Sequence, residues 1–115
     1  MSFWRDEMIE FALDHETRKH MEEQIAWIER EPSNARPYYH LAQFYRINGR
    51  SEEALALLLE SVRLDSAFAD PHASLAEIYA IQGDYAAAWR HARAAEAHGV
   101  VRAVEMLLRH NVPGA

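Results

Sequence analysis

Apolar residues recur every three or four positions along most of the chain, the spacing typical of amphipathic α-helices. The pattern first appears over residues 3–13, where Trp4, Met8 and Phe11 share one face and charged residues occupy the other. We therefore predict a helix here, and its large apolar face needs a partner.

An unbroken run of polar residues, 14–20, follows this first helix. The run interrupts the apolar face, so the chain either turns here or continues as one long helix without partners. We favour a break, with a second helix over about 17–30. That helix ends before Pro32, because the residue preceding a proline avoids the helical region.

From Pro32 to Gly99 one unit occurs twice in succession. Eight identities align without a gap when the chain is shifted so that Ala35 falls on Ala69: Ala35, Pro37, Leu41, Ala42, Tyr45, Ile47, Gly49 and Ala54 match Ala69, Pro71, Leu75, Ala76, Tyr79, Ile81, Gly83 and Ala88. We call this shift the repeat period. A fixed period of this length is the sign of stacked helical units that bury their apolar faces against one another.

Each copy reads as two helices joined by a tight turn. Gly49 and Gly83 mark the turns, and we predict a positive φ at both, since glycine adopts the left-handed conformation that ends many helices. Ser51 is predicted to cap the second helix of the first copy, and Asp70 the first helix of the second copy.

This pattern resembles the tetratricopeptide repeat, a helix-turn-helix unit of about 34 residues. The family usually has Trp where this chain has Tyr38 and His72, and Pro near Ser66 and Val100, so these positions depart from its pattern. The resemblance implies an all-α, right-handed superhelix of antiparallel helix pairs, with capping helices at both ends.

A single domain is expected over residues 1–115. Repeat 1 covers 35–68, repeat 2 covers 69–99, and a C-terminal capping helix covers 100–110. Residues 1–31 are either a degenerate repeat or an unrelated helical cap, and we favour the cap.

Composition supports an all-α, soluble protein. Ala and Leu are abundant while the β-branched residues that favour strands are few. The chain has no Cys, no basic and apolar signal segment and no apolar run long enough for a membrane span. Its net charge of −6 argues against general binding to nucleic acid or anionic membranes. We expect a cytoplasmic protein.

Candidate chemistry is sparse. His15 and His20 would lie about 140° apart around one helix, and His91 and His98 about 10 Å apart along another, so neither pair suits one metal ion. No nucleophile motif or glycine-rich phosphate loop occurs. The sequence therefore predicts neither an enzyme nor a cofactor.

In the tetratricopeptide family, the first helix of each repeat lines a concave groove that holds a peptide or a partner helix. The resemblance places these residues in the groove: Arg36, Tyr39, Gln43, Arg46, Ile47, Asp70, Ala73, Glu77, Ala80 and Ile81. We expect Arg36 beside Asp70 and Gln43 beside Glu77, pairs that either satisfy each other or recognise a ligand. Some members bind a peptide's terminal carboxylate with Lys and Asn; those positions carry other residues here, so that clamp is absent.

Three functions are compatible with the sequence. The first is a non-catalytic module that binds a protein or peptide of unknown identity in the groove. The alternative is a self-assembling unit, a homodimer formed through Phe3, Trp4, Met8 and Phe11, since two clear repeats are fewer than such stacks usually need. A histidine-based metal-binding protein is a weaker alternative.

Overall fold

A computed structural model describes residues 15–114 of the chain, and in this range all regular structure is helical. The helices are α2 (His15–Arg30), α3 (Ala35–Ile47), α4 (Ser51–Leu64), α5 (Ala69–Ile81), α6 (Tyr85–Ala97) and α7 (Arg102–Arg109). None of these helices is long and apolar enough to cross a membrane. The helix predicted over residues 3–13 lies outside the described residues.

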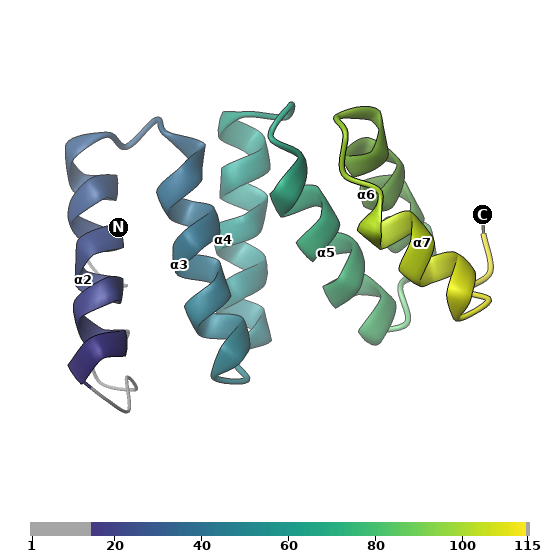
Figure 1. Ribbon diagram of the computed structural model, residues 1–115, viewed down its shortest axis with the longest axis horizontal. Helices are drawn as coiled ribbons and strands as arrows, with labels where there is room; N and C mark the ends of the chain where they lie inside the picture. The colour runs from purple at the N-terminus through teal and green to yellow at the C-terminus, as the bar shows by residue number, and fades with distance from the viewer. Residues whose placement is uncertain (1–14, 115) are drawn as a thin grey trace.

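The helices stand side by side in chain order (Figure 1). Each packs against the next, and α7 contacts α5 as well as α6. Helix α5 is the most enclosed, with eight buried residues, because α4, α6 and α7 all pack against it. The predicted all-α helical-repeat fold is confirmed.

Two clusters of buried side chains form the core. The first joins α2, α3 and α4, and it also takes Leu75 and Ile78 from α5. The second is built from α5, α6 and α7, mainly of alanines around Trp89 and Leu107. Small side chains let these helices pack closely. Since α5 contributes to both clusters, neither helix pair has a core of its own.

The ends of the helices follow the predicted turn chemistry. Gly49 and Gly83 have φ values of 74° and 82°, so both predictions of a positive φ are confirmed. The N–H of Arg50 bonds to the carbonyl of Tyr45, and that of Asp84 to Tyr79, each at 2.9 Å. These bonds across the last turn define the Schellman motif, which satisfies carbonyls that the helix leaves unpaired.

Helix beginnings depart from prediction at two places. Ser51 is the first residue of α4 and Arg50 holds the capping position, without a side-chain bond to the helix. Asp70 lies inside the first turn of α5, whose capping residue is Phe68. In both cases the capping residue lies one or two residues before the polar residue that sequence alone suggested as the cap.

The second helix begins at His15, slightly before the predicted start near residue 17, and the predicted break before it is not tested by the described residues. Residues 15–20 are helical, and they form the start of α2. Most of their side chains are exposed, and His20 lies 3.9 Å from Glu16 and 3.6 Å from Glu23, the neighbours that one helical turn provides.

Candidate functional site

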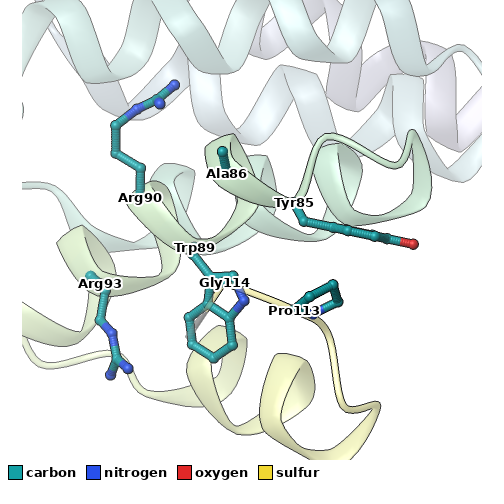
Figure 2. Close-up of a pocket in the computed structure, with 7 residues that line it drawn as sticks. All are labelled: Tyr85, Ala86, Trp89, Arg90, Arg93, Pro113 and Gly114. Carbon is teal, nitrogen blue, oxygen red and sulfur yellow. The ribbon is translucent and has the colours of Figure 1, made fainter.

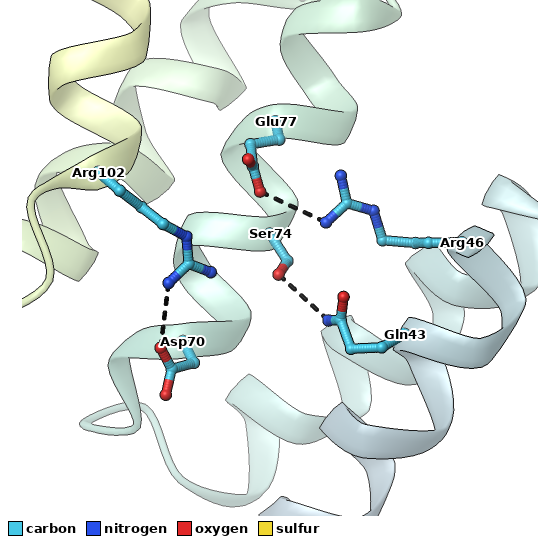
Figure 3. Close-up of polar contacts among 6 residues, drawn as sticks. All are labelled: Gln43, Arg46, Asp70, Ser74, Glu77 and Arg102. Atoms are coloured by element: carbon cyan, nitrogen blue, oxygen red, sulfur yellow. Dashed lines mark hydrogen bonds and ion pairs between the residues drawn. The ribbon is translucent and has the colours of Figure 1, made fainter. Parts of the chain in front are cut away.

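The inner face of α3 and α5 carries a short ladder of side-chain contacts (Figure 3). Gln43 Nε2 donates to Ser74 Oγ at 3.3 Å, and Arg46 donates to a Glu77 carboxylate oxygen at 3.3 Å. The predicted contact of Gln43 with Glu77 is therefore wrong. The two residues of each pair are closer in sequence than the repeat period. Neighbouring helices are thus offset by about one turn, which the period alone does not reveal.

The expected pair of Arg36 and Asp70 is replaced by two other contacts. Asp70 accepts a hydrogen bond of 3.2 Å from Arg102 of α7 (Figure 3). The Arg36 guanidinium lies 4.6 Å from the centre of the Phe68 ring, a cation–π contact. Tyr39 packs edge-on against the same ring at 5.4 Å. The predicted Arg36–Asp70 pair does not form, because Asp70 binds Arg102 of α7 and Arg36 packs on the Phe68 ring.

Four of the predicted groove residues, Arg46, Glu77, Ala80 and Ile81, gather around one concavity of about 470 Å³, which we call the α5–α7 hollow. Its other walls come from the start of α6, from α7 and from the residues after it: Tyr85, Met106, His110 and Val112. The Ile81 side chain is 84% exposed at its edge. An apolar wall with one ion pair at its border suits an apolar side chain of a peptide.

Two further groove residues, Gln43 and Ile47, line a second concavity of about 340 Å³, the α2–α3 hollow. The rest of its wall is His20, Gln24, Trp27, His40 and Phe44. Ile47 is 82% exposed, so the two repeats present isoleucines at matching positions. Among residues 15–114, the buried oxygen Gln24 Oε1 accepts no hydrogen bond.

One predicted groove residue is inaccessible. Ala73 has no exposed surface, because it belongs to the second core cluster, which α7 helps to close. Helix α7 thereby acts as more than a cap. Ala103 is buried like Ala69 and Ala35, which stand one and two repeat periods before it. Helix α7 therefore occupies the position that the first helix of a third repeat would have.

Sequence reasoning missed the contributions of α2, α6 and α7 to these hollows. Trp27 and Gln24 fall in the segment predicted as a cap, and Met106 and His110 in the predicted C-terminal capping helix. Counting the repeat period forward from Ala69 to Ala103 was the available signal for α7. No comparable signal marked the walls supplied by Tyr85 and Val112.

A third concavity, the α6 hollow, lies between α6 and the residues after α7 (Figure 2). Trp89 forms its floor, and the Trp89 indole N–H donates to the Val112 carbonyl at 3.1 Å. The guanidinium of Arg93 lies 5.0 Å from the centre of this ring. The hydrogen bond from Trp89 holds the residues after α7 against α6.

One position of the repeat ties the preceding loop to its helix. The Tyr38 hydroxyl donates to the Pro32 carbonyl at 2.9 Å, and His72 Nε2 bonds to the Ser66 carbonyl at 3.0 Å. Both donor and acceptor positions are related by one repeat period. A carbonyl can only accept, so His72 carries its proton on Nε2. Burial raises the pKa of Tyr38, which keeps its hydroxyl protonated.

His72 Nδ1 then accepts from His91 Nδ1, 3.0 Å away, and Tyr79 stacks on the His91 ring at 5.6 Å. Burial, His72 and Arg90 lower the pKa of His91 from 6.5 to about 4. The His91 ring is therefore neutral near pH 7, and both histidine rings have a structural partner. Among residues 15–114, no three His, Asp or Glu side chains are grouped as a metal ion would require.

Comparison with known families agrees with this geometry. A family model described as tetratricopeptide repeat matches residues 26–56, which include the end of α2, all of α3 and the start of α4. This match supports the tetratricopeptide repeat family for that part of the chain. Tetratricopeptide repeats are generally non-catalytic and mediate contacts between proteins. No curated protein matches this chain.

Proposed function

We propose that this tetratricopeptide repeat protein is a non-catalytic module that binds a peptide or helix of a partner protein along the inner face of α3 and α5. The observation that carries the proposal is the α5–α7 hollow, with Ile81 exposed at its edge. Residues 35–68 and 69–99 would serve as its two repeats, and 100–110 as their cap.

The chemistry of the hollow favours an apolar side chain of the partner. Ala80, Ile81, Met106 and Val112 supply apolar surface, while the Arg46–Glu77 pair stands at the border. These two charged groups can exchange hydrogen bonds with the backbone of a bound peptide. The net charge of −6 favours a protein over a nucleic acid as the partner.

An array of short synthetic peptides, probed with the purified full chain, tests this proposal. We expect binders that share an apolar anchor residue. Ile81→Asp should weaken their binding at least tenfold in fluorescence anisotropy, because it places a charge in the apolar wall. Since Ile81 is exposed, helicity should be unchanged.

Leu59→Asp is the matched control, an exposed leucine of α4 away from the hollow, and it should bind peptides as the natural chain does. Equal loss in both variants, or binding that survives Ile81→Asp, would place the binding site elsewhere. An array without any binder would argue against peptide recognition by this face.

A further inference from the structure

Within residues 15–114, helix α2 has no counterpart of the first helix that precedes α4 and packs against it. One repeat period after His20, Gln24 and Trp27 stand Ala54, Leu58 and Ser61 of α4. All three α4 residues are fully buried, and Ser61 Oγ donates to the Ala35 carbonyl of α3 at 2.8 Å. Their α2 counterparts instead line the open α2–α3 hollow. Helix α2 thus has the position of a second helix whose first helix is not among the described residues.

The opposite wall of the hollow leads to the same conclusion. His40 and Gln43 of α3 correspond to Ser74 and Glu77 of α5 in the next repeat. Ser74 and Glu77 are the residues that contact α3. Both walls of the α2–α3 hollow therefore match surfaces that hold α3 in the following pair. The hollow has the position of a seat for a helix of the α3 kind.

The chain itself contains a segment with the right pattern. Tyr38, Ala42 and Tyr45 are buried residues of α3, and Trp4, Met8 and Phe11 stand one repeat period before them. These three residues lie outside the described part of the chain. We propose that residues 3–13 of a second copy occupy the α2–α3 hollow. Its unsatisfied Gln24 Oε1 requires a donor, and the indole N–H of Trp4 is one.

A second copy is favoured because the glycine turn that joins the two helices of each repeat has no counterpart before α2. In the described hairpins the chain reverses at Gly49 and at Gly83, both with positive φ. The corresponding residue is His15, which is already part of α2. In the register of the repeat, this place therefore lacks the glycine that reverses the chain before α4 and before α6. Two copies that exchange these segments would form a symmetric dimer with both hollows filled.

Engineered cysteines test the arrangement directly, since the chain has none of its own. Met8 and Gln24 correspond to Ala42 and Leu58, which share the first core cluster. In the full chain, Met8→Cys with Gln24→Cys should form disulfides between chains under mild oxidation. A dimer should then persist on a non-reducing gel, while light scattering of the natural chain should give twice the mass of 13.3 kDa.

Phe11→Glu should weaken dimer formation at least tenfold, whereas Glu10→Lys, on the polar face of the same segment, should leave it unchanged. A disulfide within one chain would assign the segment to its own hollow and overturn the exchange. Free thiols in both positions would overturn the hollow as its site. Ile81→Asp should not affect the disulfide, so the outcome is independent of peptide binding at the α5–α7 hollow.

Discussion

At the scale of single residues, one position of the repeat forms the same hydrogen bond to the preceding loop with two different side chains. Tyr38 and His72 each fasten the loop before their helix to a carbonyl six residues earlier. The tyrosine does so with a hydroxyl that stays protonated over the physiological range. The histidine can do so only in one tautomer, and it then engages His91 through its other nitrogen. In the second repeat this position is therefore linked to His91, whose pKa burial lowers to about 4.

Acidification should destabilise the protein through His91. Its pKa is about 4 in the folded chain, but near 6.5 when unfolded, so the unfolded chain binds the extra proton between these values. Stability should be full above pH 6.5 and fall as the pH is lowered towards 4. We expect a loss of about 1–2 kcal/mol in the free energy of unfolding, since solvent reaches part of the ring.

Urea unfolding at pH 7.0 and at pH 4.5 measures this loss. The His91→Gln variant serves as the reference, because carboxylates titrate in the same range in both proteins. An equal fall in the two proteins would show that His91 is not responsible.

Substitution of Gly49 tests the turn at the same scale. Gly49→Val should lower the free energy of unfolding by about 1–2 kcal/mol, since a β-branched residue fits poorly at a φ of 74°. A Cβ atom there meets no other group within 4 Å, so the cost comes from the backbone alone. Gly49→Asn should cost clearly less, and a thermal melt comparing the two variants checks this order.

At the scale of the helices, the two repeats begin their second helices differently. Asp84 caps α6 by accepting a 3.2 Å hydrogen bond from the N–H of Ala87. Its counterpart Arg50 provides no such bond, and interacts with Glu53 instead. Helix α4 begins with Glu52 and Glu53 in its first turn, where negative charge is favoured, while α6 has no acidic residue there. The side-chain cap thus matters more for α6.

Removal of this cap should be measurable. Asp84→Ala should reduce the free energy of unfolding by about 1 kcal/mol, the usual effect of losing a capping side chain. Asp84→Asn keeps the accepting oxygen and should retain most of the stability. Chemical denaturation of the two variants gives the comparison, and an alanine variant as stable as the asparagine one would contradict the role of the cap.

The sequence predicted the helix pairs because alanines, aromatic residues and turn glycines keep fixed places in each repeat. It could not predict contacts that depend on how neighbouring helices are offset. Gln43 reaches Ser74, and Arg46 reaches Glu77, one turn away from the positions that the period suggests. The role of α7 at Asp70 and Ala73 was missed because its sequence preserves little of the repeat beyond Ala103.

At the scale of the whole molecule, helix α5 connects the two core clusters, because it contributes buried residues to both. Leu75 and Ile78 complete the first core cluster, while Ala73 and Ala76 belong to the second. A defect in α5 therefore reaches both halves of the described chain. The two repeats should consequently unfold together rather than one after the other.

Leu75→Ala tests this unity. The residue is fully buried, so its truncation should cost about 2–4 kcal/mol. We expect helicity, followed by circular dichroism, to be lost in a single transition. The fluorescence of Trp27 in the first half and of Trp89 in the second should change at the same denaturant concentration. Separate transitions for the two signals would show that the halves unfold independently.

The side-chain ladder on the inner face has a mechanical consequence. Arg46–Glu77 and Asp70–Arg102 join successive first helices through partly exposed ion pairs, which contribute little free energy each. The helices themselves are held by buried cores that are much harder to separate. Under tension between its two ends, the stack would therefore extend first by parting these ion pairs while its helices stay intact. The curvature of the helix stack would then change under small forces, such as those exerted by a molecule bound along its inner face.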